Sequence, residues 1–172
     1  MHYIAWWPVI FALTIATVSD LRSRRIPNCL VFPFLLAGIV VSGIVEGGRG
    51  LEHSLEGVGL AALLLGPLYL MGGMGMGDVK LCASVGAWIG PHQLIFALAF
   101  MGLAGGVFAF GWAICGGFLA EALSGAGDVI FGLPKRRLRP HPTLVLTNPE
   151  TRKMPYGPAI AIGTILSFFS LP

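Results

Sequence analysis

Long apolar segments separated by short polar ones account for most of this chain. The apolar segments cover residues 3–19, 29–45, 55–73, 79–89, 94–119 and 155–171. A helix needs about 20 predominantly apolar residues to cross a bilayer, and these runs lack the alternation of lipid-facing strands. The pattern predicts an all-α, polytopic membrane protein with about six transmembrane helices, formed by a single domain over residues 1–172.

The fourth apolar segment is shorter than the rest, because its 11 residues rise only about 16 Å as a helix. It follows the stretch MGGMGMGD at residues 71–78, whose glycines propagate helices poorly. Non-helical backbone at membrane depth is tolerated where it is packed in protein or lines a wet cavity. The glycine-rich stretch is therefore predicted to be unwound and to mark a hydrated pocket.

The composition agrees with a bilayer environment. Hydrophobic residues make up 55% of the chain and charged residues 11%, against about 25% charged in ordinary soluble domains. The first apolar segment has no basic region before it and no small-residue cleavage site after it, so we expect a retained helix. The net charge of +3 does not indicate a nucleic-acid partner, because the basic residues lie at the ends of apolar segments.

The basic residues are distributed unequally between alternate loops. Short loops rich in Lys and Arg stay in the cytoplasm, and ten of the eleven basic residues fall in the first, third and fifth loops. The second loop carries three glutamates against Arg49, and the fourth, residues 91–93, has no Lys or Arg. Both termini are therefore predicted to be periplasmic. The ten residues are Arg22, Arg24, Arg25, Lys80, Lys135, Arg136, Arg137, Arg139, Arg152 and Lys153.

Two acidic residues differ from the others, which lie in predicted loops or near segment ends. Asp20 and Asp78 fall at a membrane boundary or just inside it, where a charge is costly and commonly functional. Both map to the cytoplasmic ends of their helices, so tertiary packing can bring them together. Two adjacent carboxylates share a proton and supply a base and an acid. That is the chemistry by which aspartic proteases hydrolyse a peptide bond without a metal or a covalent intermediate.

Each of these features also has a purely structural interpretation. Asp78 could cap a helix that begins at Val79, and Asp20 could belong to a solvated turn beside Arg22. The glycine run could serve only to let helices cross closely. Taken singly, the residues leave these alternatives open.

Other catalytic and binding motifs are missing from the sequence. It contains no HExxH and no GxSxG, and the glycine run is not a P-loop because Lys80 is followed by Leu81. The three cysteines form no CxxC pair, so neither a zinc site nor a disulfide framework is predicted. We expect no metal and no cofactor, and we assign none of the four histidines to catalysis.

Three segments resemble, in order, the motifs of type IV prepilin peptidases, which are aspartic proteases of the membrane. Residues 19–28, SDLRSRRIPN, resemble the segment with the first catalytic aspartate, including its Arg-Ile-Pro-Asn ending. Residues 75–81, GMGDVKL, resemble the GxGD segment with the second. Residues 154–159, MPYGPA, are similar to the Pro-x-Gly-Pro opening of the last helix.

The resemblance implies that Asp20 and Asp78 are the catalytic aspartates and that Gly75 and Gly77 shape the loop that presents Asp78. The implied substrate is a prepilin or pseudopilin, cleaved at the cytoplasmic face of a bacterial inner membrane for pilus assembly or secretion. Membrane lipid is the other implied partner, and the sequence indicates no oligomeric state. Further positions are implied to contact substrate or to support the site, namely Lys80, Arg25, Pro27, Asn28, Pro155, Gly157 and Pro158.

The sequence departs from the longer members of that family, which carry a cysteine-rich cytoplasmic region associated with N-methylation. Its second apolar segment begins almost directly after Asn28. The resemblance is thus to the short form of tight-adherence pilus systems, and we expect a peptidase without methyltransferase activity. The basic segment 134–153 is expected to set topology and attract anionic lipid, with substrate binding as the lesser option.

Two other classes of protein fit parts of the pattern. Another GxGD intramembrane protease, such as an archaeal preflagellin peptidase or a presenilin-like enzyme, would differ in its substrate. A small transporter or a proton-conducting subunit would also place carboxylates in a hydrated membrane cavity, and would produce flux. The chain shows no clear internal repeat of the kind many transporters have.

Overall fold

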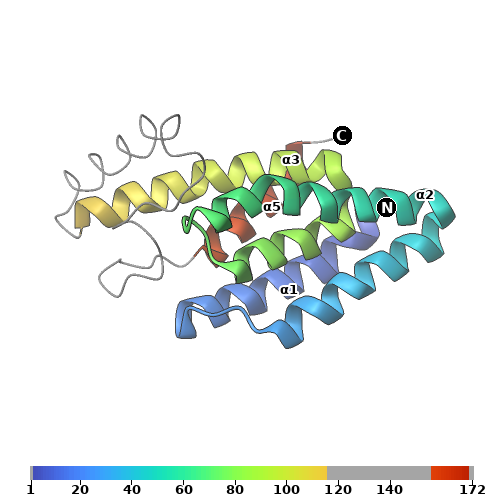
Figure 1. Ribbon diagram of the computed structural model, residues 1–172, viewed down its shortest axis with the longest axis horizontal. Helices are drawn as coiled ribbons and strands as arrows, with labels where there is room; N and C mark the ends of the chain where they lie inside the picture. The colour runs from blue at the N-terminus through green and yellow to red at the C-terminus, as the bar shows by residue number, and fades with distance from the viewer. Residues whose placement is uncertain (1, 116–155, 171–172) are drawn as a thin grey trace.

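The computed structural model describes residues 2–115 and 156–170, and it is helical throughout that part apart from short connections (Figure 1). The helices are α1 (His2–Ser23), α2 (Asn28–Leu70), α3 (Met76–Cys115) and α5 (Gly157–Ser170). The all-α fold class predicted from the sequence is confirmed. Residues 116–155, which include Pro155 and the basic segment 134–153, lie outside the described residues.

Both long helices bend at a glycine and fold back on themselves (Figure 1). The backbone of Gly47 in α2 has φ 64° and ψ −142°, and that of Gly90 in α3 has φ 73° and ψ 176°. Glycine adopts positive φ without steric cost, so one residue suffices to turn the chain. Within the described residues, the six predicted apolar segments coincide largely with α1, with the arms of α2 and α3 on either side of these glycines, and with α5.

The sequence prediction of two loops at these bends is wrong in extent. The polar residues around Glu46, Glu52 and Glu56 belong to α2, and residues 91–93 belong to α3. The helix continues on both sides because only one residue at each bend leaves the helical region. The charged residues of the predicted second loop therefore lie within α2, on either side of Gly47.

The bend of α3 is stabilised by hydrogen bonds from α2. Pro91 lacks an N–H group, so the carbonyl of Ala87 has no intrahelical donor four residues later. The buried hydroxyls of Ser42 and Ser54 both donate to that carbonyl, at 3.3 Å and 2.8 Å. One serine comes from each arm of α2, so the helix break in α3 ties the two arms of α2 together.

Close backbone contacts bring the two arms of α2 against the first arm of α3. A Cβ on Gly57 would overlap the carbonyl of Gly86. On the other arm, a Cβ on Gly38 would lie 2.8 Å from the Trp88 ring, whose Nε1 donates to the carbonyl of Phe34 at 2.9 Å. Small residues permit such close crossings in membrane helices, which associate by packing and hydrogen bonding.

The last helix, α5, packs antiparallel to α1. The Asp20 side chain near the end of α1 accepts a hydrogen bond from Gly157 at the start of α5. The ring of Trp6 packs, tilted by 39°, at a centroid distance of 4.5 Å from that of Phe168 near the end of α5. The other side of α5 packs on the second arm of α3, where a Cβ on Gly163 would overlap Met101. The start of α5 is thus placed at the same end of the bundle as the end of α1.

The outer surface of the bundle is strongly apolar. Large side chains such as Trp7, Leu63 and Val107 are between 71% and 79% exposed. Both α2 and α3 are long and apolar enough to cross a membrane. An apolar exterior of this extent is unusual for a protein surrounded by water and is expected where lipid covers it.

Candidate active site

The turn between α1 and α2 reverses the chain within four residues, 24–27. Arg24 has φ 51°, and its N–H donates to the carbonyl of Asp20 at 2.8 Å, which ends α1. The hydroxyl of Ser19 donates to the carbonyl of Arg25 at 2.9 Å. Pro27 then takes an extended backbone, φ −70° and ψ 131°, and forms the N-cap of α2. The predicted site residues Arg25 and Pro27 therefore build this turn, and the Arg25 side chain is exposed.

Asp20 is buried, with 6% of its surface exposed, and its carboxylate Oδ2 accepts the backbone N–H of Gly157 at 2.7 Å. Gly157 is the first residue of α5, so the carboxylate lies at the positive end of that helix. A Cβ on Gly157 would lie 3.0 Å from both Cβ and Oδ2 of Asp20, so only glycine fits without displacing a neighbour. Pro158 follows in the first turn of α5, where its missing N–H costs nothing.

Asp78 lies in the first turn of α3. The carbonyl of Gly75 accepts the N–H groups of Asp78 at 3.1 Å and of Val79 at 3.3 Å. Gly75 also lies beside the carboxylate, since a Cβ there would be 3.0 Å from Asp78 Oδ2. The non-helical connection is residues 71–75 alone, because Gly75 already receives the first N–H groups of the helix.

The prediction that the unwound stretch extends to Asp78 is therefore wrong. Gly77 is helical and belongs to the first turn of α3, not to a loop. Glycine at this position allows the start of α3 to approach the α1–α2 turn closely, because a Cβ on Gly77 would lie 3.4 Å from Cβ of Ile26. The alternative in which Asp78 caps a helix that begins at Val79 is excluded, since the helix begins at Met76.

A second contact joins the two motifs. The ammonium of Lys80 donates to Oδ1 of Asn28 at 3.4 Å and lies 5.1 Å from the ring centroid of Phe32. Lys80 comes from the first arm of α3, and Asn28 and Phe32 come from the beginning of α2. Of the predicted supporting residues, Lys80 and Asn28 are thus in contact with each other, and they fix the start of α2 against the start of α3.

The charges of Asp20 and Asp78 act on one another, although 57 residues separate them along the chain. Tyr156, which precedes Gly157, lies near the same two aspartates. Burial raises the pKa of the Tyr156 hydroxyl, and the nearby charge of Asp78 raises it further. Tyr156 is the residue directly before α5, and its carbonyl accepts the N–H of Ile160 at 3.0 Å. The three sequence motifs therefore converge on one point, with an aspartate from α1, an aspartate from α3 and the N-terminus of α5.

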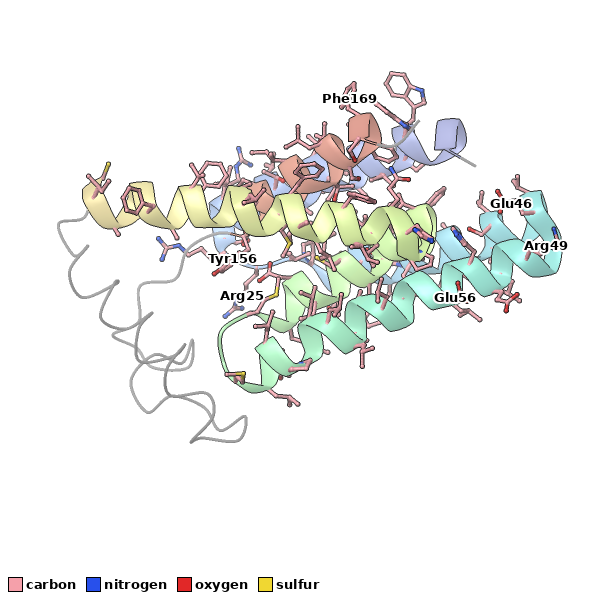
Figure 2. All side chains as sticks on the ribbon, turned by 90° about the horizontal axis from the view of Figure 1, so that it is seen from above. Arg25, Glu46, Arg49, Glu56, Tyr156 and Phe169 are labelled. Carbon is pink, nitrogen blue, oxygen red and sulfur yellow. The ribbon has the colours of Figure 1, made fainter. Side chains whose placement is uncertain are left out.

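The site occupies one end of the bundle. Figure 2 shows Arg25 and Tyr156 together at that end and Glu46, Arg49 and Glu56 at the opposite one. The grouping of the first and third predicted loops at one end, away from the second, agrees with the structure. Pro155, also predicted to support the site, lies outside the described residues.

Two residues of the site were not assigned from the sequence. Tyr156 and Ile26 both lie within segments that resemble family motifs, yet neither type suggests chemistry beside a pair of aspartates. Ile26 reads as one more apolar residue, and its contact with Gly77 depends on how two distant turns meet. The hydroxyl of Tyr156 is the one feature in the sequence that could have marked this residue as part of a polar site. In the described part of the chain, no three His, Cys, Asp or Glu side chains gather closely enough to hold a metal ion.

The chain matches the sequence profile of a known family. The sequence profile described as the type IV leader peptidase family matches residues 7–110, which include most of α1, all of α2 and most of α3. That match covers more than half of the chain and both aspartates. The chain belongs to the type IV leader peptidase family.

Several curated relatives are named prepilin leader peptidase/N-methyltransferase. The chain is 30% identical over 162 residues to the one from Bacillus subtilis (strain 168), which covers 92% of this chain and 52% of the relative. It is 33% identical over 108 residues to that of Aeromonas salmonicida (strain A449), covering 59% and 37%. For Escherichia coli (strain K12) the identity is 30% over 101 residues, covering 55% and 44%.

The chain spans about half the length of these curated relatives, or less. No solved structure gives a significant match.

Proposed function

We propose that this member of the type IV leader peptidase family is an aspartic endopeptidase of the membrane, with Asp20 and Asp78 as its catalytic pair. The observation that carries the proposal is the convergence of these two carboxylates beside the N-terminus of α5. Two distant acidic residues on different helices have no structural need to approach each other, since their repulsion destabilises the fold. A shared proton and a peptide substrate give that approach a function.

The surroundings of the two carboxylates differ, and this difference supports separate roles. Asp20 accepts the N–H of Gly157 at the positive end of α5, and both features favour its ionised form. Asp78 also lies in the first turn of a helix, α3, and accepts a backbone hydrogen bond from Gly75. In the proposal Asp78 carries the shared proton and Asp20 acts as the base, an assignment that the hydrogen bond of 2.7 Å from Gly157 to Asp20 supports.

Hydrolysis then follows the order of an aspartic protease. Asp20 takes a proton from a water molecule while the water oxygen bonds to the carbon of the scissile carbonyl, and Asp78 gives its proton to the carbonyl oxygen. In the collapse of the tetrahedral adduct, that oxygen returns its proton to Asp78. The bond between carbon and nitrogen breaks, and Asp20 gives its proton to the leaving nitrogen. Both carboxyl groups regain their starting protonation states, and no metal or covalent intermediate takes part.

The substrate in this proposal is the leader peptide of a prepilin or pseudopilin. The names of the relatives support this, and so does the position of the site at a bundle end that carries exposed arginines. Basic residues favour the cytoplasmic face, so we place the site there, in a bacterial inner membrane, with both termini on the periplasmic side. Six helical segments, from α1, the arms of α2 and α3, and α5, would then span the bilayer.

We further propose that the chain cleaves leaders without methylating the mature N-terminus. The link between α1 and α2 has only four residues, 24–27, so no additional region is inserted there. Mass spectrometry of a processed pilin co-expressed with this chain tests this point. We expect an unmodified N-terminus, and a mass increase of one methyl group would contradict the proposal.

Co-expression with a prepilin tests the peptidase activity. Asp20→Asn and Asp78→Asn keep the side-chain shape but remove the acid–base function, and each variant should leave the leader uncleaved. Glu56→Gln is the matched control, because this exposed acid lies at the opposite end of the bundle. Normal processing by either aspartate variant would overturn the proposal.

A further inference from the structure

Thr17 has a buried hydroxyl whose behaviour differs from that of the other helical threonines described. Threonines inside helices commonly donate to the carbonyl four residues earlier. Thr14 does so to Ile10 at 2.8 Å, and Thr164 does so to Ile160 at 2.8 Å. Oγ1 of Thr17 is buried and has no hydrogen-bond partner within the part of the chain that the structure describes.

The position of Thr17 places its hydroxyl on the same side of α1 as the Asp20 carboxylate. Thr17 lies three residues before Asp20 on α1, so the two side chains share a helix face. Both flank the start of α5. The point that a Cβ on Gly157 would occupy lies 3.3 Å from Cα of Thr17 and 3.0 Å from Oδ2 of Asp20.

A buried hydroxyl without a partner carries a desolvation penalty. The acceptor that shares this face with Thr17 is the Asp20 carboxylate, of which Oδ2 already accepts the N–H of Gly157. A carboxylate accepts several hydrogen bonds, so a second donor fits its capacity. Hydrogen bonds at catalytic groups often tighten only once substrate is bound.

We propose that Thr17 is a positioning residue for Asp20, and that its hydroxyl donates to the Asp20 carboxylate when the two aspartates take up their working geometry. This inference rests on the proposed function, in which Asp20 is the base. Thr17 and the N–H of Gly157 then hold the carboxylate from the α1 side and the α5 side. Both donors favour the ionised form of Asp20.

Other titratable groups near Asp20 come from each neighbouring element. Asp78 faces it from α3, and Tyr156 lies beside it at the start of α5. The arginines that follow Asp20, namely Arg22, Arg24 and Arg25, are exposed. Loss of the Thr17 donor removes support for negative charge on Asp20 while these other groups stay unchanged. The acidic limb of the activity profile therefore moves to higher pH.

The test compares Thr17→Val, Thr17→Ser and Thr14→Val in the purified full chain, with a synthetic leader-peptide substrate. Valine keeps the shape of threonine and removes the hydroxyl, and serine keeps the hydroxyl. We expect Thr17→Val to lower kcat about five- to twenty-fold with little change in KM, and to shift the acidic limb upward by roughly half a pH unit or more. Thr17→Ser should recover most of kcat. Thr14→Val is the matched control and should behave as wild type, because that hydroxyl is satisfied by its own helix.

Wild-type kcat and pH profile in Thr17→Val would overturn the inference. Equal impairment of Thr17→Ser and Thr17→Val would also overturn it, because the cause would then be packing of the methyl group. The Asp20→Asn variant, measured in the same assay, keeps this failure separate from failure of the proposed function. An active Asp20→Asn variant contradicts the dyad, whereas an inactive one beside a wild-type-like Thr17→Val contradicts only the role of Thr17.

Discussion

The carboxylate of Asp20 accepts the backbone N–H of Gly157 at 2.7 Å, and this bond joins residues 137 positions apart. It links the end of α1 to the start of α5. Asp78 lies close enough to interact electrostatically with the same aspartate. A side chain at position 157 would collide with the aspartate itself. The same glycine therefore supplies the donor and leaves the room for the acceptor.

This close contact predicts a strong effect of Gly157→Ala. The added Cβ would lie 3.0 Å from Asp20 and 3.3 Å from Cα of Thr17, so the carboxylate or α5 must shift. We expect cleavage to fall by about ten- to a hundred-fold, because small displacements of catalytic groups are costly. Initial rates of leader cleavage measure the effect. Gly106→Ala is the control, since a Cβ there meets nothing within 4 Å, and it should leave the rate unchanged. Equal rates in both variants would contradict the contact.

The contact between Lys80 and Asn28 predicts a measurable coupling between the two motifs. Lys80→Met and Asn28→Ala each remove the hydrogen bond of 3.4 Å, so their effects on stability should not add. For a partly exposed pair we expect a coupling free energy of about 0.5 kcal/mol. Thermal unfolding of the two single variants and the double variant in detergent gives this value. Fully additive effects would show that the pair contributes nothing.

The break in α3 predicts that Ser54 matters for stability more than for catalysis. Ser54→Ala leaves the Ala87 carbonyl with only the longer bond from Ser42, so we expect a loss of about 1 kcal/mol. Activity per folded molecule should stay near wild type, because this bond lies at the end away from the aspartates. Ser23→Ala is the control, since its hydroxyl is exposed and bonds within its own helix. If Ser54→Ala is as stable as that control, the Ala87 carbonyl does not need its side-chain donors.

The proposed orientation predicts which bundle end a membrane-impermeant thiol reagent reaches in intact cells. In a chain whose three native cysteines are replaced, Arg49→Cys should be labelled from the periplasm. Arg25→Cys should be labelled only after the inner membrane is permeabilised, because the two exposed side chains lie at opposite ends (Figure 2). Labelling of Arg25→Cys in intact cells would reverse the orientation.

Much of the fold could be predicted from hydrophobicity, because the apolar segments are long and continuous. The bends at Gly47 and Gly90 could not, since a single residue with positive φ has no distinguishing pattern among 25 glycines. The sequence alone was enough to select Asp20 and Asp78 as candidate site residues, because acids in apolar surroundings are costly. The contacts of Ile26, Tyr156 and Thr17 depend on packing between helices far apart in the sequence, and such contacts have no local signal.

The most direct test of the account is the pH dependence of leader cleavage by the purified chain in liposomes, for wild type and for Asp20→Asn and Asp78→Asn. A pair of carboxyl groups that shares one proton predicts a bell-shaped profile for wild type, with the rate falling when both are protonated and when both are ionised. Each asparagine variant should be at least a thousand-fold slower at every pH, while Glu56→Gln keeps the wild-type profile. Cleavage by either aspartate variant within ten-fold of wild type, at any pH, would contradict a catalytic pair of Asp20 and Asp78.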